Sequence, residues 1–127
     1  KLTFQNIHSY LKPGGTFIWS WDQSIFAGIE YNGKNYIATR SYHDETGLEK
    51  KDWIKNGTSV HITKLKSSTW FQLLRNAGFE VTGYFEPPPK NLNRGHAEKY
   101  KYYSIHKAEI IPCTFIFSCK KLKRKQT

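Results

Sequence analysis

The sequence predicts an α/β fold. A short amphipathic helix is followed by a glycine turn and an apolar run, and the same order of helix, glycine and apolar run recurs further along the chain. A last apolar run lies close to the C-terminus. Helices that alternate with buried strands are typical of α/β sheets, because the helices cover the faces of the strands. The 127 residues are enough for one domain.

The first helix is expected over residues 2–11. One helical face is marked by the i, i+3, i+4, i+7 spacing of Phe4, Ile7, His8 and Leu11. Residues 12–15, Lys-Pro-Gly-Gly, end this helix, because proline bars continuation and glycine permits a tight reversal. The β-branched and aromatic run at 16–21 suits a buried strand. Because the chain starts with Lys1 and the helical pattern begins at once, we expect a longer parent protein, although a processed chain would also lack its Met.

Residues 22–66 differ in character, and we expect them to form an insertion that covers one end of the sheet. The Asn-Gly-Lys-Asn segment at 32–35 lies between short apolar runs at 29–31 and 36–39, which predicts a β-hairpin. Alternation at 59–63 predicts one further short strand. The polar stretch between these features predicts no strand.

A second helix is predicted over residues 67–77, with an N-cap among Ser67, Ser68 and Thr69. Its apolar positions again follow i, i+3, i+4 and i+7, namely Trp70, Leu73, Leu74 and Ala77. Gly78 suits the left-handed position that ends a helix.

Two more strands complete the predicted sheet. Residues 79–85 are expected to form a strand with a bulge at Gly83, which the three prolines at 87–89 terminate. Residues 90–108 are polar, basic and rich in tyrosine, with no clear period. The apolar run at 114–118 predicts the final buried strand.

The formal net charge of +10 is uneven, since five of these charges lie in the last eight residues. We therefore separate a basic tail, 122–127, from a domain at 1–121. Such a tail can bind nucleic acid or an anionic membrane surface, although a solvated chain end explains it more simply. No run approaches the roughly 18 apolar residues of a membrane span, and no leader peptide is recognisable.

The two cysteines, Cys113 and Cys119, form neither a CxxC pair nor part of a zinc motif. On one extended strand they would lie too far apart to bond to each other. We therefore expect two reduced thiols and a cytoplasmic protein.

Four segments resemble the class I S-adenosylmethionine-dependent methyltransferases. Residues 8–17, His-Ser-Tyr-Leu-Lys-Pro-Gly-Gly-Thr-Phe, are similar to the LkPGG turn between the fourth helix and the fifth strand of that family. Residues 74–81, Leu-Arg-Asn-Ala-Gly-Phe-Glu-Val, resemble its turn from the fifth helix into the sixth strand. Residues 86–89, Glu-Pro-Pro-Pro, are similar to the ending of that strand in a small-molecule branch. Residues 112–121 resemble the terminal strand, which is expected to insert antiparallel at the sheet edge.

The resemblance implies the C-terminal half of a Rossmann-like methyltransferase sheet: helix, strand, insertion with hairpin, helix and antiparallel strand pair. It also implies transfer of a methyl group from S-adenosyl-L-methionine to a small-molecule acceptor, in class EC 2.1.1. The family's cofactor loop is absent, because Gly14-Gly15 follows a helix and no G-x-G-x-x-G is present. We therefore expect an incomplete sheet that contributes the acceptor pocket, is inactive alone and needs the missing N-terminal half of the same domain.

The best candidates for lining the acceptor pocket lie at the end of the first predicted strand. Ligands of open α/β sheets bind beyond the carboxyl ends of the parallel strands, where this chain has Trp19, Ser20, Trp21 and Asp22. Aromatic side chains shape an apolar cavity and keep a donor at its rim. Packing of the two tryptophans in the core is an equally good explanation.

Three further candidates lie on the insertion. Tyr42 and His43 stand beside two carboxylates, so His43 can act as a general base, although surface histidines are commoner than catalytic ones. His61 precedes the second helix, as a histidine often does in the resembled branch, and by analogy is expected to face the pocket. No third ligand joins His43 and His61, so no metal site is predicted. Catalytic residues stay unassigned, because positioning of two reactants supplies much of the rate.

Two other functions stay open at this point. Lysine and tyrosine alternate at 99–107 and, with the basic tail, can bind single-stranded nucleic acid. A solvated connection whose tyrosines lean on the sheet explains the segment better, so nucleic acid is not the expected partner. The other alternative is a non-catalytic interaction module that pairs with another chain.

Overall fold

The structure is a computed structural model of the chain. The residues that it describes are 2–46, 48–54, 58–90, 99–101 and 103–122. For 48–54 and 58–62 the description covers the backbone.

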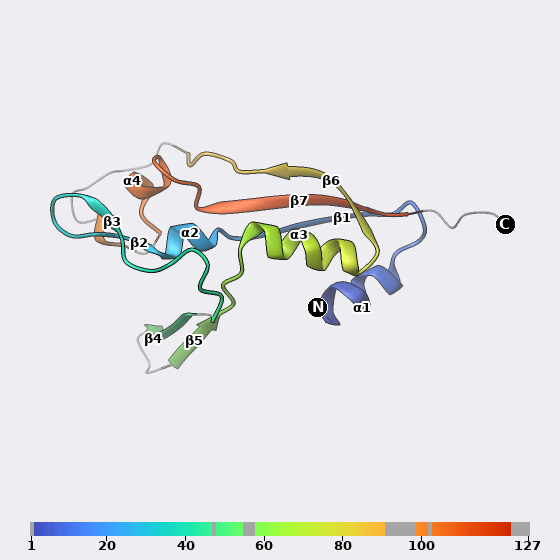
Figure 1. Cartoon of the computed structure of the whole chain (residues 1–127), viewed down its shortest axis with the longest axis horizontal. Coiled ribbons are helices and arrows are strands. Elements are labelled where there is room, and N and C mark those ends of the chain that lie inside the picture. The colour runs from blue at the N-terminus through green and yellow to red at the C-terminus, as the bar shows by residue number, and fades with distance from the viewer. Residues whose placement is uncertain (1, 47, 55–57, 91–98, 102, 123–127) are drawn as a thin grey trace.

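The main sheet has three strands in the order β1-β7-β6 (Figure 1). They span Thr16–Asp22 (β1), Thr114–Lys121 (β7) and Phe79–Phe85 (β6). Because β7 is antiparallel to both neighbours, β1 and β6 run parallel and end at the same edge of the sheet. The antiparallel direction of the final strand is confirmed, but its expected place at the sheet edge is wrong.

The position of β7 follows from its side chains. Phe115, Phe117 and Cys119 alternate along the strand and are at most 2% exposed. The helices α1 and α3 cover these side chains, and β1 and β6 flank them through the pairs Trp19–Phe117 and Tyr84–Phe117. The structure therefore places the most apolar strand at the centre.

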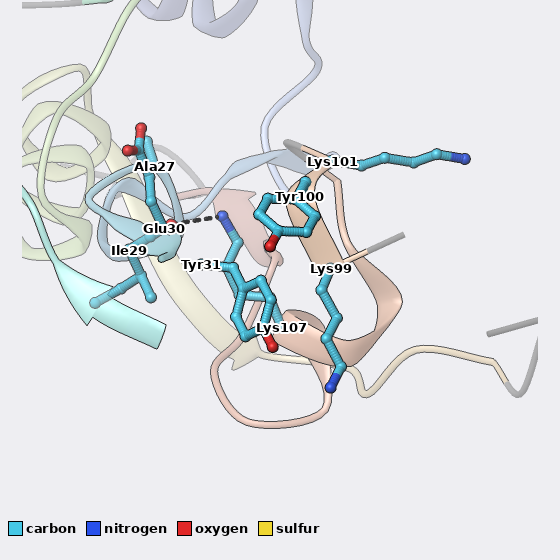
Figure 2. A pocket seen from close by; sticks show the side chains of 8 residues that line it. All are labelled: Ala27, Ile29, Glu30, Tyr31, Lys99, Tyr100, Lys101 and Lys107. Atoms are coloured by element: carbon cyan, nitrogen blue, oxygen red, sulfur yellow. Dashed lines mark hydrogen bonds between the residues drawn. The ribbon is translucent and has the colours of Figure 1, made fainter. Parts of the chain in front are cut away.

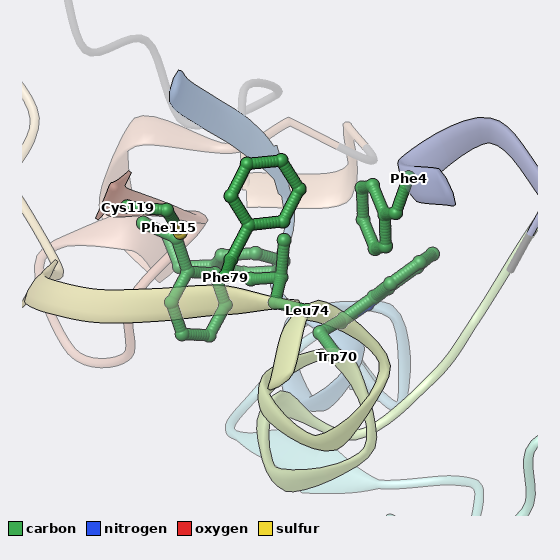
Figure 3. Packing of buried hydrophobic residues seen from close by; sticks show 7 residues of the cluster. Phe4, Trp70, Leu74, Phe79, Phe115 and Cys119 are labelled. Atoms are coloured by element: carbon green, nitrogen blue, oxygen red, sulfur yellow. The ribbon is translucent and has the colours of Figure 1, made fainter. Parts of the chain in front are cut away.

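Two helices cover one face of this sheet (Figure 1). They are α1, Leu2–Tyr10, and α3, Ser67–Asn76. Figure 3 shows the cluster between helices and sheet, in which Phe4 of α1 and Leu74 of α3 meet the strand residues. The predicted N-cap is wrong, since Lys66 occupies that position and makes no side-chain cap. Ser67 is instead the first helical residue, and its hydroxyl bonds elsewhere.

Two predicted irregularities are confirmed. Gly78 ends α3 with φ +101°, and a Cβ there would lie 2.7 Å from Nε2 of His8, so the turn needs glycine for two reasons. The β6–β7 register shifts between Val81 and Gly83, which is the expected bulge.

Two hairpins occupy the segment between β1 and α3. The predicted hairpin joins β2, Ile29–Tyr31, to β3, Tyr36–Ala38, and its turn is closed by Asn32 N–H donating to Asn35 O at 3.0 Å. The second hairpin pairs β5, Thr58–Ile62, with β4, Leu48–Ile54. β4 was not predicted, because its charged sequence hides the alternation that marks a strand.

Two short helices that were not predicted lie beyond the carboxyl end of β1. They are α2, Ser24–Ala27, and α4, Ile105–Ala108, the latter capped by Ser104. The ammonium of Lys107, a residue only 4% exposed, joins them to β2 by donating to the carbonyls of Phe26 and Ile29, both at 2.9 Å. Figure 2 shows the bond to Ile29 (dashed).

Candidate functional site

A buried glutamine connects the carboxyl ends of β1 and β6. Gln23 directly follows β1 and is 3% exposed. Its amide nitrogen donates to the Tyr84 hydroxyl at 2.6 Å and to Oε2 of Glu86 at 2.7 Å. Its carbonyl oxygen accepts a bond from the Ser67 hydroxyl at 3.0 Å. One side chain thus joins the ends of β1 and β6 to the start of α3.

Tyr84 completes a ring of hydrogen bonds in this polar network of Gln23, Ser67, Tyr84 and Glu86. Its hydroxyl donates to Oγ of Ser67 at 3.0 Å. Burial raises the pKa of Tyr84, and the hydrogen bonds with Ser67 and Gln23 oppose that shift. The hydroxyl therefore stays protonated at neutral pH and remains a donor.

An aromatic groove lies near the network, at the end of β1 and the start of α3. This tryptophan groove, of about 290 Å³, is lined by Thr3, Phe4, Trp19, Trp21, Thr63, Leu65, Trp70 and Leu73. The indoles of Trp19 and Trp21 are nearly parallel, at 12° with centroids 6.2 Å apart. Trp70 meets Trp19 edge-on at 4.6 Å. The groove lies at the carboxyl end of β1, where a ligand of an α/β sheet is expected.

The two predicted tryptophans have different surroundings. Trp19 is half-buried and packs on the rings of Phe4, Phe115 and Phe117, so it belongs to the core as well as to the groove. Trp21 is 40% exposed, and its indole N–H donates to the carbonyl of Thr63 at 3.1 Å. Trp19 therefore packs in the core and still lines the groove, and Trp21 keeps an exposed surface that a ligand can contact.

Asp22 and Ser20 lie on the opposite side of β1 from the tryptophans, as strand alternation requires. Asp22 accepts a 2.7 Å hydrogen bond from the hydroxyl of Tyr103. The contact attaches the 103–108 segment to the end of β1. Asp22 is thus placed behind the groove rather than among its lining residues.

Tyr42 and His43 reach the start of α3 from the insertion. The Tyr42 hydroxyl accepts a long bond, 3.4 Å, from Ser67 N–H at the edge of the polar network. Nδ1 of His43 lies 3.3 Å from the ammonium of Lys66. The neighbouring carboxylates bond elsewhere, Asp44 to Arg40 and Glu45 to Thr69, so the group next to the His43 ring is the Lys66 cation and not a carboxylate.

His61 lies on β5, where its backbone pairs with Glu49. Its side chain falls outside the described part of the structure, so the expected orientation toward the pocket stays a prediction. In Figure 1 the β4–β5 hairpin extends away from the main sheet.

A buried charge lies beside this site. Lys64 is 3% exposed, and its ammonium has no hydrogen-bond partner among the described residues. Burial lowers the pKa of Lys64, the charge of Arg40 lowers it further, and Asp44 opposes both. Hydrogen bonds from the Thr46 side chain and backbone lower the pKa of Asp44 to about 2, and Arg40 adds to this shift.

The tyrosines of the basic segment pack against the protein. Tyr103 stacks on Phe26 at 6.5 Å, and Tyr100 meets Tyr31 edge-on at 4.9 Å. With Lys99, Lys101 and Lys107 this segment lines a second cavity of about 300 Å³ (Figure 2). These rings contact other residues of the same chain, as expected of a connecting segment that packs against the fold.

The same fold is found in crystal structures of other proteins. One, from Listeria monocytogenes, is assigned as an S-adenosylmethionine-dependent methyltransferase and matches with a TM-score of 0.67 at 17% identity, over 94% of this chain and 53% of its own. The second, an S-adenosylmethionine-dependent methyltransferase from Mesorhizobium loti, gives 0.57 at 20% identity, over 92% and 52%. The chain has the fold of half a methyltransferase. It spans about half the length of these proteins, and the architecture expected from the sequence is confirmed. No protein-family model and no curated protein sequence matches it.

The glycine pair at 14–15 does not form a cofactor-binding loop. The backbones of Gly14 and Gly15 bond to Lys121 at 2.7 and 2.9 Å, and a Cβ on Gly15 would lie 2.8 Å from the Lys12 carbonyl. This glycine pair closes the α1–β1 turn and is not presented to a ligand. Among the described residues, no group of three or more His, Cys, Asp or Glu side chains can hold a metal ion. Within the same part of the chain, no helix is long and apolar enough to cross a membrane.

Several residues of the site were not predicted from the sequence. Gln23 could have been included, because it follows the strand whose end was already selected. Tyr84 and Glu86 lie at the carboxyl end of β6, which runs parallel to β1, so the rule that ligands bind at such strand ends applies to them as well. Trp70 was assigned only to the apolar face of its helix, and no sequence signal singles out Lys64.

Proposed function

We propose that the chain is the acceptor-binding part of an S-adenosylmethionine-dependent methyltransferase that acts on a small molecule. The observation that carries this proposal is the junction at the carboxyl ends of β1 and β6. There an aromatic groove and a closed polar network lie near each other, in a chain with the fold of half such an enzyme. Apolar walls with a few fixed polar groups are typical of small-molecule sites.

In this proposal the cofactor is held by residues outside the chain, in an N-terminal half of the same domain. Two features of the sheet support it. Among the described residues nothing pairs with the outer edge of β1. The sheet face opposite the helices carries Ile18 and Phe85, which are 67% and 55% exposed. An unpaired edge and an apolar face of this kind are usually covered in a complete domain.

The residues of this chain would bind and orient the acceptor. Trp19 and Trp21 form its wall, and Asp22 holds the segment behind them. Tyr42, His43 and His61 belong to the insertion, 22–66, which we propose acts as a lid that limits access of water. His43 is the candidate base within that lid, next to Lys66.

The proposal is tested by comparing this chain with the protein encoded by its entire reading frame. S-adenosyl-L-methionine binding is measured by calorimetry, and transfer of a labelled methyl group is followed in small-molecule extracts. We expect binding and transfer from the longer protein and neither from the 127-residue chain. Cofactor binding by this chain alone would refute the proposed division, as would a reading frame without an upstream strand, glycine-rich loop and helix.

The acceptor site is tested within the longer protein by Trp21→Ala. This change should raise KM for the acceptor at least tenfold and leave cofactor affinity unchanged, because the groove contacts the acceptor. Tyr10→Ala is the matched control, since Tyr10 is 86% exposed on α1 and does not line the groove. Equal effects of the two changes would exclude the groove as the acceptor site.

A further inference from the structure

The lining of the tryptophan groove restricts the chemistry of its occupant. All eight lining residues are uncharged: two are threonines, and the others are Phe4, Leu65, Leu73 and three tryptophans. This is notable in a chain with a net charge of +10. The second cavity, by contrast, is lined by Glu30 and three lysines.

An ion would bind poorly in this groove. Burial of a charged group without a partner is strongly unfavourable, and among the described residues no lining side chain can supply an opposite charge. The polar network with its carboxylate lies outside this lining and is already hydrogen-bonded. The groove therefore favours a neutral ligand.

The aromatic walls of the groove favour a flat ligand. Trp19 and Trp21 present nearly parallel rings, and Trp21 is exposed enough to offer its ring to a ligand. Aromatic rings gain stabilisation beyond burial when they stack or meet edge to face. The volume, about 290 Å³, is at the lower end of small-molecule pockets, which suits one ring or two fused rings.

One polar atom of the lining lacks a partner. Trp70 is 8% exposed, and its indole N–H has no acceptor among the described residues. A buried donor of this kind is usually satisfied, so its isolation at a groove indicates a missing acceptor. An oxygen atom on the ligand would supply it.

From these observations we infer that the acceptor is a small, uncharged aromatic compound that carries a hydroxyl or carbonyl oxygen. The inference rests on the proposed function, because it names the substrate class of the same groove. It is a statement about binding and can be tested without methyl transfer.

The test is a titration of the ¹⁵N-labelled chain followed by NMR at the indole N–H signals. Three probes share one ring: 4-methylphenol, toluene and 4-methylbenzoate, which is anionic at pH 7. We expect saturable shifts of the Trp19, Trp21 and Trp70 signals with 4-methylphenol, and binding of 4-methylbenzoate at least tenfold weaker. The backbone N–H signal of Lys121, at the opposite end of the sheet from the groove, should not move.

Two variants identify the contacts. Trp21→Ala should weaken 4-methylphenol binding at least fivefold, whereas Tyr10→Ala should leave it unchanged, because Tyr10 is exposed and does not line the groove. Trp70→Phe removes the unpartnered N–H and should abolish the preference for 4-methylphenol over toluene. The spectrum itself reports whether each variant is folded.

Equal binding of the anion, shifts that include the Lys121 signal, or no saturable binding to a folded chain would overturn the inference. Failure of the proposed function is a different result, namely a longer protein that does not bind S-adenosyl-L-methionine. If the longer protein transfers methyl groups but 4-methylphenol does not bind, the substrate class is wrong and the proposed function stands.

Discussion

Gln23→Leu tests whether the polar network holds the two strand ends together. The change removes three hydrogen bonds of the amide, two to neutral hydroxyls and one to the Glu86 carboxylate. At about 1 kcal/mol for each neutral bond and about 2 for the charged one, the gross loss is about 4 kcal/mol. Glu86 is exposed and Tyr84 is 38% exposed, so water replaces part of the lost hydrogen bonding. We expect a net loss of about 2–3 kcal/mol.

The assay is urea unfolding followed by circular dichroism, with an unchanged m-value as the sign that both variants unfold in the same way. Gln72→Leu is the matched control, because it is the same substitution at an exposed position of α3 and should change stability by less than about 0.5 kcal/mol. The reasoning is refuted if Gln23→Leu is no more destabilising than this control.

Three further predictions concern single sites. Gly78→Ala should destabilise the chain by about 2–4 kcal/mol in the same urea assay, because the φ of Gly78 is +101° and the new Cβ would lie 2.7 Å from His8. Adding His8→Ala should recover part of this loss. Purely additive effects of the two substitutions would argue against the contact. The Asp44 carboxyl should titrate near pH 2 by NMR. Its pKa should rise in Thr46→Ala but stay below the usual 3.8, because the backbone N–H of residue 46 and Arg40 still lower it. Since the folded pKa is the lower one, the stabilisation from Asp44 is full above about pH 4 and is lost as the pH falls through 2. Burial raises the pKa of Cys119 to about 11, so iodoacetamide at pH 8 should leave this thiol unlabelled in the native chain and label it in urea; rapid native labelling would contradict its burial.

The main elements could be predicted because each carries a local signal. The spacing from Trp70 to Ala77 marks one helical face, and Gly78 marks the end of that helix with a conformation that few other residues adopt. The Asn-Gly hairpin at 32–35 was predicted for the same reason. The charged strand at 48–54 and the four-residue helices have no comparable periodicity, and they were missed.

The candidate site was predicted in part. Trp19 and Trp21 line the groove, as their place at the end of a strand indicated. The His43 ring lies next to Lys66, which is distant in the sequence. The sequence around His43 shows only the two carboxylates that follow it, so this neighbour could not be predicted.

The sequence by itself determined the order of helices and strands, the turns that separate them and the strand end at which a ligand is expected, because these depend on residues a few positions apart. Only the tertiary structure placed the last strand between the other two, aligned the ends of β1 and β6, and brought Gln23 to Tyr84 and Trp70 to Trp19. These contacts join residues 51 and more positions apart, and burial of aromatic surface across the whole sheet selects them.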